Sequence, residues 1–212
     1  VNKTPPRVSP APLLPVFSPT PTQAEIMRAR VFAEPLMAVG GPPSDEENRA
    51  LAQAITAYVA AGQDEALGPF EAFLAARPRS PWRAPLLANL GVAYRRTGYF
   101  TRALTAWEEA CTLSKTEQRP NGQPVADHAL GELAELSGRL GRYERLEALF
   151  AEIEGRDVRG SATEKIAGAR QGLWLMRNRP EDAFRCGPMA LDRLLAYGNA
   201  EYRRSPKIAE SR

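Results

Sequence analysis

The chain has 212 residues, of which 43% are hydrophobic and 25% are charged, values typical of a globular protein with a buried core. Its formal net charge is +3 and no stretch collects five basic residues, so nucleic-acid binding is not expected. No apolar run reaches the roughly 18 residues of a membrane-spanning helix, and no signal peptide is visible, so a secreted, a periplasmic and a cytoplasmic location all stay open.

Residues 1–43 are rich in proline, since ten of the 19 prolines precede Asp45. Proline lacks a backbone donor and interrupts helices, so we expect a largely extended segment with a short helix over 23–32 at most. Two interpretations are open for this segment. It is a tether or proline-rich ligand, or it is a disordered leader.

A first pair of helices is predicted directly after this segment. Ser44 and Glu47 have the spacing of a capping box, in which each side chain accepts a hydrogen bond from the other residue's amide. The helix that starts there carries apolar residues at helical spacing and stops near Gly62. Asp64 is expected to cap the second helix, which Pro69 bends or delays.

The clearest pattern lies between Ser80 and Lys115, where two amphipathic helices are predicted on either side of a break at Gly98. Small residues stand where the helices should approach closely, and large residues fill the space between them. The two stripes consist of Leu87, Leu90, Gly91 and Tyr94 in the first helix, and of Ala103, Trp107 and Ala110 in the second.

These stripes closely resemble the pattern of the tetratricopeptide repeat (TPR) family. The resemblance implies an all-α stack of antiparallel helical hairpins over residues 44–180. The predicted helix ends are spaced by 36, 43 and 37 residues, near the family period of about 34, and they lie at Gly62, Gly98, Gly141 and Asn178. We therefore expect three hairpins and the first helix of a fourth.

The repeat register extends the pattern to later residues. Phe150 should stand in for Trp107, and Trp174 should take the place of Tyr94. Asn178 should end its helix in a left-handed conformation, as glycine does in the earlier turns.

The TPR resemblance also implies a function as a protein-interaction scaffold. In this family the first helix of each repeat lines a concave groove that receives a protein or peptide partner. The groove would be lined by Asn89, Arg95, Arg96, His128, Glu132, Glu135 and Arg139. The alternative is that these side chains form only a solvated polar face.

Residues 181–212 contain a predicted final helix that follows Cys186-Gly187-Pro188. With Ala190 and Leu191, this segment resembles the nucleophile segment of papain-like cysteine peptidases that trim double-glycine leaders, and Cys186 would be the nucleophile. A thiolate is favoured at the start of a helix. Such enzymes need a downstream histidine as base, and no histidine follows Cys186, so the chain alone should not be a competent peptidase.

Two explanations for this last segment stay open. It is the truncated start of a peptidase-like domain in a longer protein, or it is a helix that seals the stack, with Cys186 partly buried near its cap.

Neither explanation involves a metal. The single histidine, His128, and the two cysteines, Cys111 and Cys186, lack the spacing of a zinc site, and no glycine-rich phosphate loop is present, so we expect no metal and no cofactor.

Overall fold

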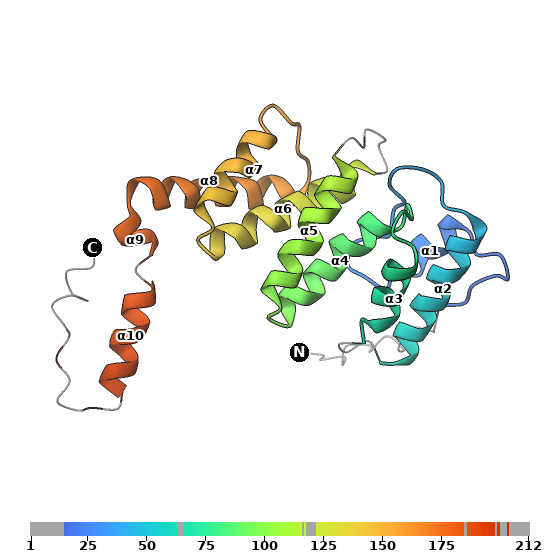
Figure 1. Cartoon of the computed structure of the whole chain (residues 1–212), viewed down its shortest axis with the longest axis horizontal. Coiled ribbons are helices and arrows are strands. Elements are labelled where there is room, and N and C mark those ends of the chain that lie inside the picture. The colour runs from blue at the N-terminus through green and yellow to red at the C-terminus, as the bar shows by residue number, and fades with distance from the viewer. Residues whose placement is uncertain are drawn as a thin grey trace, which may run out of the picture.

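The computed structural model describes residues 15–62, 66–115, 117, 122–184, 186–197, 199 and 203. All regular secondary structure within these ranges is helical, and they contain no strand (Figure 1). The predicted all-α class is therefore confirmed. Asp64, the expected cap of the second helix, lies outside the described residues.

Ten helices follow one another along the described chain (Figure 1). Their bounds are α1 Gln23–Arg28, α2 Asp45–Ala60, α3 Gly68–Ala76, α4 Arg83–Arg96, α5 Phe100–Ser114, α6 Gln123–Arg139, α7 Tyr143–Glu152, α8 Ser161–Asn178, α9 Pro180–Ala183 and α10 Cys186–Tyr197.

The proline-rich segment is extended outside α1, but its described part packs on the helices. Ile26, Leu36 and Val39 are all buried in the same hydrophobic core as α2 to α8. The Val39 amide donates a hydrogen bond to the carbonyl of Pro81 at 2.9 Å. Residues 15–43 therefore form part of the folded body, a role that proline content alone does not reveal.

The capping box at the start of α2 is confirmed. The Glu47 amide donates to Ser44 Oγ at 3.2 Å, and the Ser44 amide donates to Glu47 Oε2 at 2.9 Å. The helix ends before Gly62, whose φ of +86° lies in the left-handed region. Helix α3 begins at Gly68, directly before Pro69, so the predicted delay in its start is also confirmed. Proline is tolerated in the first turn of a helix because its missing amide would have no partner there.

The α4–α5 hairpin forms the centre of the core. Trp107 is fully buried and its Nε1 donates to the carbonyl of Ala88 at 2.9 Å. A methyl group built at Gly91 would meet this indole, with its carbon 2.5 Å from Trp107 Cε2. Only glycine therefore lets α4 approach α5 this closely.

The α6–α7 hairpin repeats the turn of the α4–α5 hairpin. Gly98 and Gly141 have φ values of +85° and +66°. Each turn is closed by the same hydrogen bonds, including Tyr99 amide to Tyr94 carbonyl at 2.8 Å and Arg142 amide to Ser137 carbonyl at 2.9 Å. A left-handed residue that reverses the chain in this way is usually glycine, so the two predicted turn glycines act as expected.

The helices α6 and α8 approach through small residues. A Cβ built at Gly131 would lie 2.8 Å from the Cα of Ala162, and one built at Gly138 would lie 3.7 Å from the Cα of Ala169. Glycine and alanine let two helix backbones come this close. Helix α6, the first helix of its hairpin, therefore packs closely beside α8.

Helix α8 ends at Asn178 as predicted, but the left-handed conformation expected for this residue is wrong. Asn178 remains in the helix, and Arg30 is the only non-glycine residue with positive φ among those described. The Arg179 amide continues the helical pattern by donating to Leu175, and the Asn178 side chain donates to Trp174. Asparagine tolerates the left-handed conformation but does not require it.

Two further expectations fail because the chain does not turn back after α8. Trp174 is 56% exposed, so it does not fill the buried place that Tyr94 occupies in its own hairpin. Helix α10 stands apart from the main body, joined to it through α9 (Figure 1). It does not seal the stack, and Cys186 is exposed rather than partly buried.

Candidate functional site

One face of α6 carries a row of charged side chains that joins three helices. His128, Glu132, Glu135 and Arg139 follow at helical spacing and so share this face. The Nη1 of Arg95 in α4 donates to Glu132 at 2.8 Å and to Glu135 at 2.9 Å. From α8, Lys165 pairs with Glu132. We call Arg95, Glu132, Glu135, Arg139 and Lys165 the charged row.

The two carboxylates of the charged row are paired with neighbouring cations. Glu132 has only 5% of its side chain exposed and lies between Arg95 and Lys165. Burial raises the pKa of Glu135, but hydrogen bonds from Arg95 and Arg139 outweigh this and leave the pKa below its usual value. Arg139 is 71% exposed, so it offers the most accessible cation of the row.

The other predicted groove residues lie in different surroundings. Asn89 is buried and its side-chain amide donates to the Pro85 carbonyl at 3.0 Å within α4, so it does not line a surface groove. Arg96 is exposed and follows Arg95 directly, about 100° further around the helix, so it points away from the charged row. His128 lies at one end of this row.

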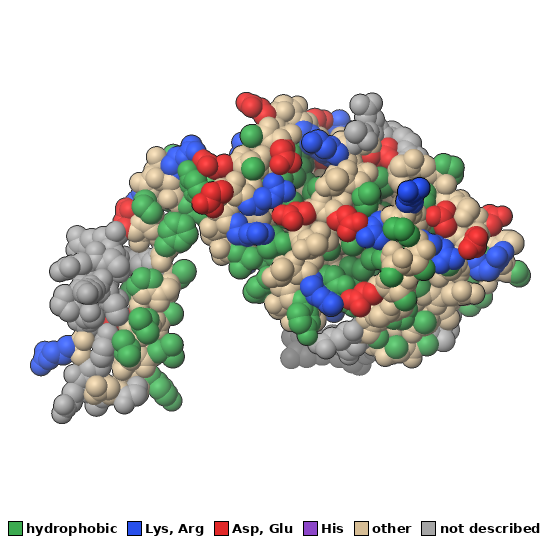
Figure 2. All heavy atoms as spheres, viewed as in Figure 1, with side chains coloured by type: hydrophobic (Ala, Val, Ile, Leu, Met, Phe, Trp, Pro, Cys, Tyr) green, Lys and Arg blue, Asp and Glu red, His purple; other side chains and the backbone are tan. Residues whose placement is uncertain are grey.

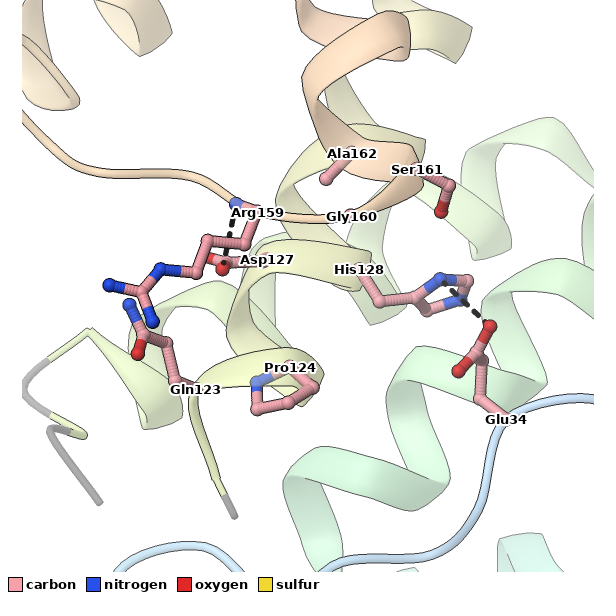
Figure 3. A pocket seen from close by; sticks show the side chains of 9 residues that line it. All are labelled: Glu34, Gln123, Pro124, Asp127, His128, Arg159, Gly160, Ser161 and Ala162. Atoms are coloured by element: carbon pink, nitrogen blue, oxygen red, sulfur yellow. Dashed lines mark hydrogen bonds and ion pairs between the residues drawn. The ribbon is translucent and has the colours of Figure 1, made fainter. Parts of the chain in front are cut away.

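A pocket of about 420 Å³ adjoins this end of the charged row (Figure 3). Three segments line it: the chain before α2, the first turns of α6, and the start of α8. Its lining residues are Glu34, Gln123, Pro124, Asp127, His128, Arg159, Gly160, Ser161 and Ala162. We call this cavity the α6–α8 pocket.

His128 presents a neutral imidazole beside this pocket. Burial lowers its pKa, and this effect outweighs the opposing influence of Glu132 and Glu34. Its Nδ1 lies 3.9 Å from Glu34 Oε1 (Figure 3). Its Nε2 is buried without a hydrogen-bond partner in the described part of the chain. A neutral imidazole can both donate and accept hydrogen bonds, which suits a polar ligand group.

Asp127 fixes the loop that completes the pocket. Its side chain is only 4% exposed, and it accepts from Arg156 Nη2 at 3.0 Å and from the Arg159 amide at 3.2 Å. The loop then passes through Gly160, with φ of +67°, into α8. No side chain caps α8, so the amides of its first turn have no side-chain acceptor.

Several of these residues were not predicted from the sequence. Lys165 stands 37 residues after His128, which is the spacing of the last predicted repeat, so the register contained a signal for it. Asp127 sits on the buried side of α6, beside a predicted groove residue. Glu34 lies in a segment without periodicity, and no sequence pattern connects it to His128.

The structure separates Cys186 from the only histidine. His128 lies beside the start of α8, whereas Cys186 follows the end of that 18-residue helix. A helix of this length spans about 27 Å, so the thiol and the imidazole lie at opposite ends of it. A cysteine peptidase needs a base within hydrogen-bond reach of its nucleophile. His128 therefore does not lie where it could act as the base for Cys186.

The described residues contain neither a metal-binding cluster nor a membrane-spanning helix. No group of three or more His, Cys, Asp or Glu side chains there is arranged to hold a metal ion. None of the described helices combines the length and the apolar character needed to span a membrane.

Comparisons of the chain with protein-family models, with curated proteins and with solved structures find no match.

Proposed function

We propose that this chain is a protein-interaction module that binds a partner peptide along the charged row and into the α6–α8 pocket. One observation carries the proposal. Ion pairs of the charged row connect α4, α6 and α8, and His128 at the end of this row lines a pocket of about 420 Å³. Stacked helical pairs commonly bind extended partners on surfaces of this kind.

The charges of the row define which partner groups fit. Glu132 is buried between Arg95 and Lys165, so it positions these cations rather than meeting a partner itself. Arg139 is exposed and can pair with a second carboxylate, because Glu135 accepts from only one of its guanidinium nitrogens, Nη2. We therefore propose a partner peptide with an acidic residue at Arg139 and a polar side chain in the pocket.

Selection of peptides from a random library on the full chain tests this proposal. Peptides that bind should bind the Arg139→Glu variant about tenfold more weakly, because the acidic residue would then face two carboxylates. Ser161→Trp should abolish binding, because the exposed Ser161 lines the α6–α8 pocket and an indole would fill it. Dissociation constants are measured by fluorescence anisotropy of labelled peptides.

Arg102→Glu provides the matched control. Arg102 is 60% exposed on α5 and pairs with Glu71 of α3, away from the charged row. This variant should bind the selected peptides as the unmodified chain does. Equal affinity of the unmodified chain, Arg139→Glu and Ser161→Trp would contradict the proposal, as would a library selection that enriches no peptide.

A peptidase function is not proposed for this chain. The resemblance at Cys186 covers a short segment, and the single histidine lies at the far end of α8. The interaction module needs no catalytic pair. It requires only the connected surface and the pocket.

A further inference from the structure

A second cavity, of about 370 Å³, lies between α5, α6 and α7. Its floor is apolar and consists of Cys111, Ala126, Leu130, Leu149 and Ile153. Ala126 and Leu130 stand two positions before His128 and Glu132, so they occupy the opposite face of α6 from the charged row. This cavity, which we call the α5–α7 pocket, is therefore separate from the proposed peptide site.

The mouth of the α5–α7 pocket contains more cations than carboxylates. Arg145 binds both acidic residues, donating to Glu108 at 3.1 Å and to Glu152 at 3.3 Å. Arg156 also lines the pocket, and its Nη2 is turned toward Asp127. Lys115 is exposed at the mouth and forms no ion pair with any residue that the structure describes.

The charged side chains around the pocket act on the pKa of Cys111, which forms part of its floor. Burial raises the pKa of its thiol to about 12, as expected where water is excluded. Arg156 and Arg145 act in the opposite direction, and each has a larger effect than Glu108 or Glu152. The two arginines therefore favour an anion, but burial outweighs them at the floor, so a ligand carboxylate is expected at the exposed mouth of the pocket.

An unpaired donor lies beside the same pocket. The Nε of Arg156 is buried and has no hydrogen-bond partner among the described residues. Buried donors are nearly always paired in native proteins, and a bound ligand is one way to pair them. A volume of about 370 Å³ lies near the lower end of the range of small-molecule sites, so the ligand should be small.

We propose that the α5–α7 pocket binds a small carboxylate attached to an apolar chain, of the size of a medium-chain fatty acid. The chain lies on Leu130 and Leu149, and the carboxylate lies at the mouth between Lys115 and Arg156. The apolar floor provides burial of the hydrocarbon chain, while the two cations select the charge of the head group. This proposal does not depend on the peptide-binding function.

Calorimetric titration of the full chain with octanoate and with octylammonium tests the proposal. The two ligands share an apolar chain and differ in charge. Octanoate should bind and octylammonium should not. Lys115→Glu should weaken octanoate binding about tenfold, and Thr112→Trp should abolish it, because an indole on the exposed Thr112 would fill the pocket.

Arg102→Glu again serves as the control and should bind octanoate normally. Thermal unfolding of each variant shows that it is folded. Both substituted positions are exposed, Thr112 on α5 and Lys115 at its C-cap. The proposal is overturned if octanoate fails to bind, if octylammonium binds equally well, or if Lys115→Glu and Thr112→Trp bind octanoate as the unmodified chain does. None of these outcomes tests the peptide site, whose variants are at Arg139 on α6 and Ser161 on α8.

Discussion

Gly91→Ala is expected to lower the free energy of unfolding by about 3 kcal/mol, the upper range for overpacking a rigid core. The added methyl carbon would lie 2.5 Å from Trp107 Cε2. Trp107 is fully buried and bonded to the Ala88 carbonyl, so it cannot move aside without losing that bond. Urea unfolding followed by tryptophan fluorescence measures the change.

Gly168→Ala is the matched control for this substitution. Gly168 lies in α8, and a Cβ built there meets no atom within 4 Å. Alanine is a better helix former than glycine, so this variant should be more stable by about 0.5 to 1 kcal/mol. If both variants changed stability by the same amount and in the same direction, the close approach of α4 and α5 at Gly91 would be wrong.

Arg156→Met is expected to lower the free energy of unfolding by about 3 kcal/mol. It would leave the carboxylate of Asp127, which is 4% exposed, without its guanidinium partner. Removing one member of a buried ion pair is strongly destabilising because the remaining charge stays buried. The double variant Arg156→Met/Asp127→Asn should recover at least half of the loss, since it removes the unpaired charge as well.

Arg159→Met gives the control for this effect. Arg159 and its partner Asp157 are 70% and 71% exposed, so the pair is screened by water. No measurable loss of stability is expected from breaking it. Urea unfolding of the unmodified chain, Arg156→Met, Arg156→Met/Asp127→Asn and Arg159→Met measures these changes in the free energy of unfolding. Equal destabilisation by Arg156→Met and Arg159→Met would show that Asp127 is not the buried anchor of the loop before α8.

The central hairpins could be predicted because their determinants are local. Gly98 and Gly141 must take positive φ for the chain to reverse, and this requirement is visible in a sequence. Gly91 and Trp107 were likewise placed by helical spacing alone. The prediction failed at Asn178, since an asparagine permits either conformation and the local sequence does not decide between them.

The candidate site was predicted in part from the repeat resemblance. That resemblance implied a groove with Arg95, Glu132, Glu135 and Arg139 in its lining, and the structure brings these four together. Membership of the TPR family and the identity of a partner remain proposals. Glu34 could not be predicted, because it lies in an extended segment whose contacts depend on tertiary packing.

Hydrogen exchange of the three tryptophan indoles, followed by nuclear magnetic resonance, tests the helical packing most directly. Trp82 and Trp107 are fully buried and donate at 2.9 Å to Asn48 and to Ala88, whereas Trp174 is 56% exposed. Burial with a hydrogen bond slows exchange, so two indole protons should exchange slowly and that of Trp174 should exchange rapidly. Rapid exchange at Trp107, or slow exchange at Trp174, would contradict the packing on which the charged row and both pockets depend.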